Sequence, residues 1–85
     1  MTRDELFQIV KRAVETTLPD LDPGEIQPNR SLADLGANSI DRLDVTMGSL
    51  ESLDLHVPMT EFAGVANLQG LVDILYRHTQ EQKQA

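Results

Sequence analysis

The sequence predicts a small all-α domain, a four-helix bundle with a long first loop and a short third helix. Three long segments repeat apolar residues every three or four positions, which is the spacing of one helix face. Pro and Gly residues mark turns between these segments. The chain has 85 residues, of which 40% are hydrophobic but only two are Phe and one is Tyr. We therefore expect one domain with an aliphatic core.

Charge and composition narrow the classes of partner. The formal net charge is −7 at pH 7. Because nucleic-acid binding depends on Lys and Arg contacts to phosphate, we expect basic protein partners and no nucleic acid. The absence of Cys excludes a disulfide framework and a cysteine-based metal site. The N-terminus has no uninterrupted apolar segment, so neither a signal peptide nor a membrane span is expected. With no Cys in the chain, we expect a cytoplasmic protein. We also expect a monomer.

The first helix is expected over Arg3 to Leu18. Thr2 and Glu5 have the spacing of a capping box. Pro19 ends the helix because the residue before a proline is pushed out of the helical region. The apolar stripe consists of Leu6, Ile9, Val10, Ala13, Val14 and Leu18. We interpret this helix as scaffold.

A long connection of about twenty residues follows, which is unusual in a compact domain. Four of its apolar residues are spaced to reach the core: Leu21, Ile26, Leu32 and Leu35. We therefore expect an ordered loop with turns at Pro23-Gly24 and Pro28-Asn29, and a short helical turn over Ser31 to Asp34. Its acidic residues lack the spacing of an EF-hand, which favours a solvated loop over a calcium site.

The second helix is expected from Ser39 or Ile40 to Leu53. Apolar residues recur at Ile40, Leu43, Met47 and Leu50, the spacing of one helix face. The expected inward face is Leu43, Leu50 and Leu53 with either Met47 or Thr46. Asp41, Asp44 and Glu51 leave the outer side acidic. Gly48 in the helix interior lowers the stability of the helix by about 1 kcal/mol relative to Ala. Close approach of a neighbouring group would explain a glycine at this position, and so would random drift of the sequence.

A short third helix is expected over Thr60 to Ala63. It follows the breaking segment Leu55 to Pro58, ends at Gly64, and carries Phe62 as a core residue. Asn67 is the expected cap of the last helix. The inward side of that helix consists of Leu68, Leu71, Val72, Leu75 and Tyr76.

Ser39 follows the turn signal Gly36-Ala37 and opens the second helix. One interpretation is that Ser39 or Asn38 caps this helix. Another is modification, because the small Gly36-Ala37 step leaves the hydroxyl accessible and a phosphate ester would gain roughly 0.3–1 kcal/mol at the positive helix end. Catalysis would need a base and an oxyanion hole, and neither His56 nor His78 has a motif that places it beside Ser39. Both histidines are interpreted as surface residues.

The segment Leu35-Gly36-Ala37-Asn38-Ser39-Ile40 resembles the acyl carrier protein family, which has an Asp/Asn-Ser-Leu/Ile step after a Leu-Gly turn. Pro58 and the final helix lie at the distances that the family expects. Most carriers have Asp where this chain has Asn38. The resemblance implies a right-handed carrier bundle over residues 1–80, followed by a polar tail over residues 81–85.

The same resemblance implies that Ser39 carries 4′-phosphopantetheine, an arm derived from coenzyme A whose thiol holds acyl groups as thioesters. The implied partners are a phosphopantetheinyl transferase and an acyltransferase, and the chain itself would not be an enzyme. From the residues alone, an unmodified acidic docking domain remains an alternative.

A narrower resemblance lies in Gly36-Ala37-Asn38-Ser39-Ile40-Asp41-Arg42, which is similar to the discrete donor carriers of polyketide β-branching cassettes. It implies an acetyl thioester, made from malonyl with a decarboxylating ketosynthase-like enzyme and presented to a hydroxymethylglutaryl synthase-like enzyme. The alternatives are a generic polyketide or fatty-acid carrier, or a peptidyl or D-alanyl carrier.

Partner enzymes are expected to contact the start of the second helix. The predicted docking residues are Asp34, Ile40, Asp41, Arg42, Asp44 and Met47. The alternative for Ile40 and Met47 is ordinary core, because helical spacing allows either role. The alternative for Arg42 is a solvated side chain that balances Asp41 and Asp44.

Overall fold

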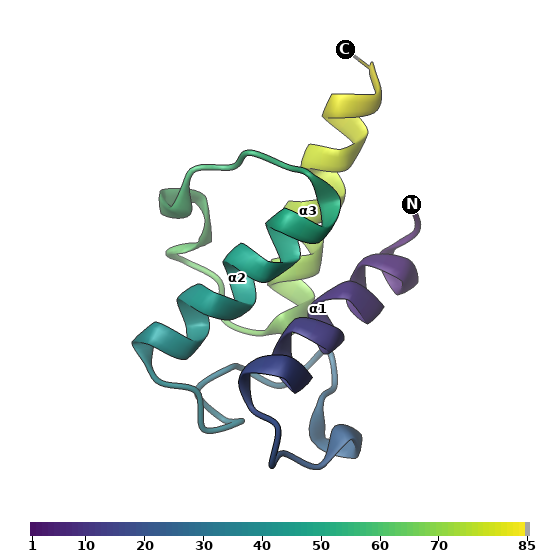
Figure 1. Cartoon of the computed structure of the whole chain (residues 1–85). Coiled ribbons are helices and arrows are strands. Elements are labelled where there is room, and N and C mark those ends of the chain that lie inside the picture. The colour runs from purple at the N-terminus through teal and green to yellow at the C-terminus, as the bar shows by residue number, and fades with distance from the viewer. Residues whose placement is uncertain (85) are drawn as a thin grey trace.

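Three α-helices and two short 3-10 helices make up the regular structure of the described residues (Figure 1). The computed structural model describes the backbone of residues 1–84 and the side chains of residues 1–81. The elements are α1 (Arg3–Thr17), η1 (Pro23–Glu25), α2 (Ser39–Leu53), η2 (Met59–Phe62) and α3 (Leu68–Gln84). No strand occurs in residues 1–84, so the predicted all-α class is confirmed. The predicted tail, residues 81–85, lies mostly outside the described side chains.

Helix α1 packs against both α2 and α3. Its start is the predicted capping box: Thr2 Oγ1 accepts from the Glu5 N–H at 3.2 Å, and Glu5 Oε1 accepts from the Thr2 N–H at 2.9 Å. It ends at Thr17, one residue earlier than expected, with Leu18 as the C-cap before Pro19. Helix α1 thus positions the other two helices, as the scaffold interpretation requires.

The long loop is ordered as predicted, and it closes the end of the molecule where α1 stops and α2 begins (Figure 1). Ile26 and Leu35 are buried, and Leu21 and Leu32 pack against the core. The loop is also tied to the start of α3 by its backbone. The carbonyl groups of Arg30 and Pro28 accept from the N–H groups of Leu68 and Gln69, each at 2.9 Å. These contacts fix the segment that leads into α2.

The core is aliphatic, as the composition predicts. Its buried members are Leu6, Val10, Val14, Ile26, Leu35, Val45, Leu50, Leu55, Val57, Leu68, Leu71, Val72 and Leu75. Phe62 and Tyr76 pack against this cluster and are only partly buried. Within the described part of the chain, no helix combines the length and apolar character that crossing a membrane requires.

The predicted inward face of α2 is partly wrong. The buried residues are Val45, Thr46, Ser49 and Leu50, whereas Leu43 is 45% exposed. Thr46 and Ser49 tolerate burial because each hydroxyl donates to the carbonyl four residues earlier, at 2.9 and 2.8 Å. Their polar groups are therefore satisfied within the helix, so this side of α2 can face the core while Leu43 faces solvent.

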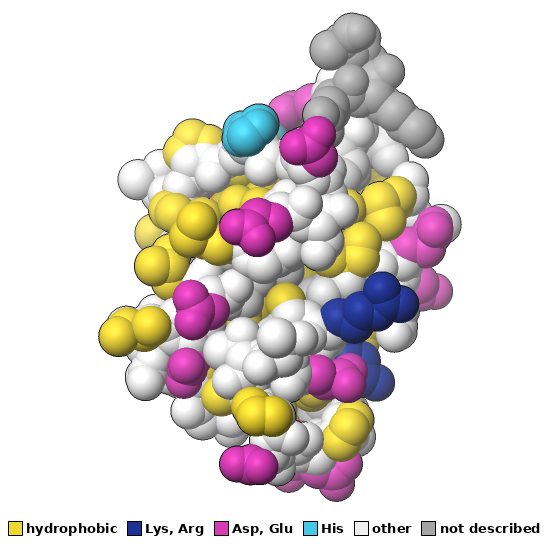
Figure 2. Space-filling model, in the orientation of Figure 1, with side chains coloured by type: hydrophobic (Ala, Val, Ile, Leu, Met, Phe, Trp, Pro, Cys, Tyr) yellow, Lys and Arg dark blue, Asp and Glu magenta, His cyan; other side chains and the backbone are white. Residues whose placement is uncertain are grey.

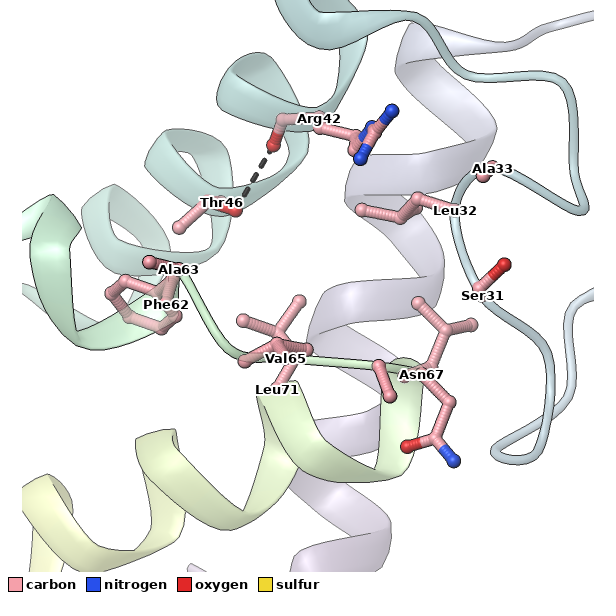
Figure 3. A pocket seen from close by; sticks show the side chains of 12 residues that line it. Ser31, Leu32, Ala33, Arg42, Thr46, Phe62, Ala63, Val65, Asn67 and Leu71 are labelled. Atoms are coloured by element: carbon pink, nitrogen blue, oxygen red, sulfur yellow. Dashed lines mark hydrogen bonds between the residues drawn. The ribbon is translucent and has the colours of Figure 1, made fainter.

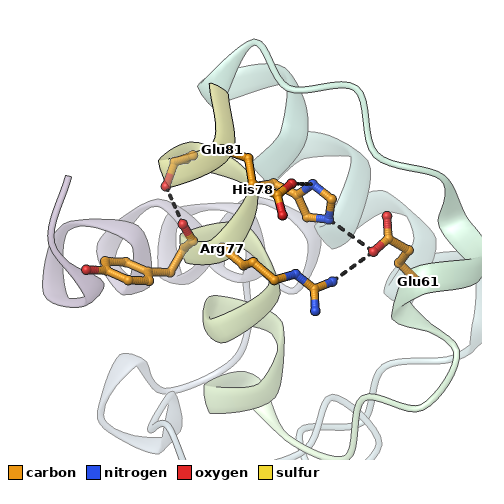
Figure 4. Close-up of polar contacts among 6 residues, drawn as sticks. Glu61, Arg77, His78 and Glu81 are labelled. Carbon is orange, nitrogen blue, oxygen red and sulfur yellow. Dashed lines mark hydrogen bonds and ion pairs between the residues drawn. The ribbon is translucent and has the colours of Figure 1, made fainter. Parts of the chain in front are cut away.

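The expected third helix is a single 3-10 segment, η2. Phe62 points to the core as predicted, and Glu61 attaches η2 to α3. Glu61 Oε1 accepts from Arg77 Nη2 at 2.9 Å and lies 3.1 Å from His78 Nε2 (Figure 4). His78 Nδ1 lies 3.4 Å from Glu81 Oε2, and the His78 side chain is 19% exposed. His78 is thus part of an interhelical contact and not an isolated surface residue.

The predicted cap of the last helix is confirmed. Asn67 Oδ1 accepts from the Gly70 N–H at 2.9 Å. This cap fixes the start of α3 where the long loop binds to it, so the loop and the last helix share one anchoring point.

Candidate functional site

The turn before α2 depends on Gly36, which has a φ of +88°. This left-handed conformation is strained for residues with a β-carbon. Two backbone hydrogen bonds close the turn, from the Gly36 N–H to the Ala33 carbonyl and from the Ala37 N–H to the Leu32 carbonyl, both at 3.0 Å. The turn therefore brings the chain into α2 in one fixed direction.

Asn38 caps α2, and Ser39 is the first residue of the helix. Asn38 Oδ1 accepts from the Asp41 N–H at 2.8 Å, and Asp41 Oδ2 accepts from the Asn38 N–H at 3.1 Å. This reciprocal pair is a capping box. It decides between the two cap residues that the sequence left open, and it shows that an amide oxygen serves as the cap where most carriers have Asp.

The Ser39 hydroxyl is available for chemistry. Ser39 is exposed, and its Oγ makes no hydrogen bond with residues 1–81. The first N–H groups of a helix lack intrahelical partners, so an anionic ester at this hydroxyl would lie in a favourable field. Because Asn38 already provides the cap, a group attached to Ser39 would not compete with helix formation. The residues present fit a phosphate-linked arm.

Two of the predicted docking carboxylates have structural roles. Asp41 belongs to the capping box described above. Asp34 Oδ2 accepts from the Ser31 N–H at 3.3 Å, while Ser31 Oγ accepts from the Asp34 N–H at 2.9 Å. Asp44 is exposed and lines a groove between α1 and α2 with Arg12. Asp34 and Asp41 thus hold the turn and the cap before α2, whereas the Asp44 side chain makes no hydrogen bond or ion pair with residues 1–81.

The predicted apolar docking residues lie on the surface. Ile40 is 70% exposed and Met47 is 45% exposed, so both belong to the solvent face of α2 and not to the core. Leu43, which was expected to face inward, lies between them on the same stripe. In Figure 2, hydrophobic and acidic side chains gather over α2, whereas the basic side chains in this view lie over α1. We call Ile40, Leu43 and Met47 the exposed stripe.

A hollow of about 440 Å³ lies beside the start of α2 (Figure 3). Its apolar wall comes from the long loop, η2 and the start of α3, and includes Leu32, Phe62, Val65 and Leu71. Arg42 lines the hollow from α2, and its side chain extends toward Leu32 and Ala33 (Figure 3). Sequence reasoning did not predict this position of Arg42, because it depends on the packing of three segments.

Known proteins match this chain over nearly its whole length. A family model described as "Phosphopantetheine attachment site" matches residues 8–75. The polyketide biosynthesis acyl-carrier-protein AcpK of Bacillus subtilis (strain 168) is 34% identical over 80 residues, covering 94% of this chain and 98% of that protein. An acyl carrier protein of Cyanidioschyzon merolae is 29% identical over 85 residues, covering 99% of this chain and 92% of that protein.

A solved structure agrees with these relatives. It is described as the curacin biosynthetic pathway HMG synthase in complex with acetyl donor-ACP. The matching chain superposes with a TM-score of 0.81 at 31% identity, covering 88% of this chain and 96% of that one. Proteins of the matched family are non-catalytic carriers with a covalently attached 4′-phosphopantetheine. The chain belongs to this phosphopantetheine-attachment family, with the all-α fold of an acyl carrier protein.

Proposed function

We propose that Ser39 carries the phosphopantetheine arm and that the chain is the acetyl donor carrier for a hydroxymethylglutaryl synthase-like enzyme in polyketide biosynthesis. The observation that carries the attachment site is the exposed Ser39 hydroxyl at the first position of α2, beside a cap supplied by Asn38. The polyketide context is supported by the similarity to AcpK, and the donor role by the similarity to the chain in the HMG synthase complex.

The other serines suit attachment less well. Ser49 is fully buried, and its Oγ donates to the Val45 carbonyl. Ser31 Oγ accepts from the Asp34 N–H within a turn. Ser52 is exposed but lies near the end of α2, where the helix dipole disfavours an anion. Ser39 combines exposure with the favourable end of a helix.

In this role the chain supplies position and partner contacts, and partner enzymes supply the chemistry. A transferase loads the arm, an acyltransferase supplies malonyl, and a decarboxylating ketosynthase-like enzyme removes its carboxylate as CO₂ with uptake of a proton. The synthase then takes the acetyl group onto its own nucleophile, which frees the thiol of the arm. Modest charged surfaces suit such repeated docking because they speed encounter without slowing release.

The exposed stripe is proposed as the apolar part of the docking surface. Asp34, Asp41, Arg42 and Asp44 are its proposed charged neighbours, and the net charge of −7 favours basic partner surfaces. Arg42 departs from that pattern and would suit an acidic patch on the synthase, although an exposed pair contributes only about 0–1 kcal/mol.

Two experiments test the proposal. With a phosphopantetheinyl transferase, Mg²⁺ and coenzyme A, the protein should gain the mass of one arm; Ser39→Ala should gain none, and the matched variant Ser52→Ala should gain one.

Acetyl transfer to the synthase from the loaded protein is then compared with transfer from an acetyl-loaded elongation carrier. Preference for this chain supports the donor role, whereas equal transfer leaves a generic acyl carrier, as in the Cyanidioschyzon relative.

A further inference from the structure

Arg42 places a positive charge close to the proposed attachment site. It follows Ser39 by three positions, and side chains at this spacing are neighbours on a helix, about 5–6 Å apart at Cβ. Its side chain makes no ion pair or hydrogen bond with residues 1–81, which is also true of Arg12 and Arg30, so its position one turn from Ser39 is what distinguishes it. A guanidinium beside a modified serine can bind the attached group if that group carries an anion.

The nearby carboxylates form no ion pair with Arg42. Asp41 Oδ2 accepts from the Asn38 N–H in the capping box, and Asp34 Oδ2 accepts from a backbone N–H in the preceding turn. Asp44 is two positions from Arg42, a spacing at which helix side chains do not face each other, and it lines the groove beside α1. The expected balancing of Arg42 by Asp41 and Asp44 is therefore not formed as an ion pair.

The direction of the Arg42 side chain adds a second observation. It lines the hollow and extends across toward Leu32 and Ala33 of the long loop (Figure 3). The rest of the wall is mixed: Leu32 and Val65 are among its apolar members, and Ser31 and Asn67 are among its polar ones. Arg42 thus places a positive charge at the border between the Ser39 turn of α2 and this hollow.

We propose that Arg42 is a positioning residue that pairs with an anionic group of the arm on Ser39 and holds the root of the arm toward this hollow. The inference deepens the proposed function and rests on Ser39 as the attachment site. Two groups share the required chemistry: the phosphodiester next to Ser39, and the carboxylate of a malonyl cargo on a folded-back arm. A guanidinium binds either one through two parallel hydrogen bonds.

The phosphodiester is the nearer of the two anions. It is fixed to Ser39 within one helical turn of Arg42, in every loaded form of the protein. The malonyl carboxylate reaches Arg42 only if the arm folds back, and it is lost on decarboxylation. The two sources therefore predict different dependence on cargo.

The test follows the side-chain Nε–H signals of arginine by NMR in the apo, phosphopantetheinylated, acetylated and malonylated protein. Pairing with the phosphodiester predicts a shifted and more slowly exchanging Arg42 signal in all three loaded forms. Pairing with the carboxylate predicts this change only after malonylation. Arg12, which belongs to α1 and lines the groove between α1 and α2, is the matched control and should not change. An Arg42 signal that is unchanged in all loaded forms would overturn the proposal.

A second measurement uses the phosphorus signal of the loaded protein. Arg42→Gln removes the charge at an exposed position while keeping a polar side chain, so the fold is retained. If the phosphodiester is the partner, the ³¹P shift should then move toward that of the free arm, whereas Arg12→Gln should leave it unchanged. If the transferase adds no arm, the proposed function and this inference both fail. If the arm is present by mass but neither Arg42 nor the phosphorus responds, this inference alone fails.

Discussion

The two faces of α2 differ from each other in a way that side-chain polarity would not suggest. The core face includes the polar residues Thr46 and Ser49, whereas the solvent face carries Ile40, Leu43 and Met47. The buried hydroxyls are satisfied by carbonyl groups of their own helix, so they cost little. The exposed stripe leaves much of its apolar surface in solvent, with Ile40 70% exposed and Leu43 and Met47 each 45% exposed. An apolar stripe on a helix is therefore available to a partner when the core is formed by other residues of the same helix.

The largest expected effect separates the two faces by stability. Leu50→Ala, on the core face, should lower the free energy of unfolding by about 2–5 kcal/mol because it removes buried methyl groups and leaves a cavity. Met47→Ala, on the exposed stripe of the same helix, should change it by less than about 0.5 kcal/mol. Urea unfolding of both variants measures the difference. Similar losses in both would place Met47 in the core.

The next effect concerns the cap at the start of the same helix. Asn38→Ala should cost about 0.5–2 kcal/mol because it removes the acceptor for the Asp41 N–H. Asn38→Asp should retain the cap, and Ser39→Ala should cost less than about 0.5 kcal/mol because Ser39 does not cap. Thermal unfolding ranks the three variants. A larger loss in Ser39→Ala than in Asn38→Ala would contradict this assignment.

The exposed stripe should matter for partners where it does not matter for folding. Met47→Ala should reduce kcat/KM for acetyl transfer to the synthase roughly fivefold, which corresponds to about 1 kcal/mol of lost contact. Leu43→Ala is expected to act in the same direction. Glu15→Ala, exposed on α1, is the control and should transfer normally. Normal transfer by both stripe variants would remove the stripe from the docking surface.

The smallest effect concerns the flank of α2 that faces α1. A β-carbon added to Gly48 would lie 3.7 Å from Ala13 Cβ, which is ordinary contact. Gly48→Ala should therefore stabilise the protein by about 0.5–1 kcal/mol through reduced backbone freedom in the unfolded chain. The urea midpoint should rise without a change in slope. A fall in stability would show that the α1–α2 contact has no room for a methyl group.

Local sequence patterns were enough to predict the caps of α1 and α3 and the bounds of α2, but they left the cap of α2 open between Asn38 and Ser39. Thr2 with Glu5, and Asn67, act within three residues of the groups that they cap. The orientation of α2 was not predictable in the same way. Apolar spacing defines a stripe, but whether a stripe faces α1 or solvent depends on the packing of neighbouring helices. Ser49 was not predicted to be buried, because a serine is usually exposed unless its hydroxyl is satisfied. Here the hydroxyl donates to the Val45 carbonyl, a bond that the sequence alone does not reveal.

Contacts between distant segments explain the remaining differences. Glu61 meets Arg77 and His78 across separations of 16 and 17 residues, so no local pattern indicates this attachment of η2. The position of Arg42 likewise depends on the loop, η2 and α3 meeting beside α2. The Ser39 motif, by contrast, was visible from the sequence because turn, cap and hydroxyl all lie within a few consecutive residues.

Peptide mapping of the loaded protein tests the central claim most directly. Trypsin cleavage after Arg30 and Arg42 releases the peptide 31–42, whose only serines are Ser31 and Ser39. Tandem mass spectrometry should place the whole mass of the arm on fragments that contain Ser39 and exclude Ser31. An arm on Ser31, or on the peptide that contains Ser49 and Ser52, would contradict the account.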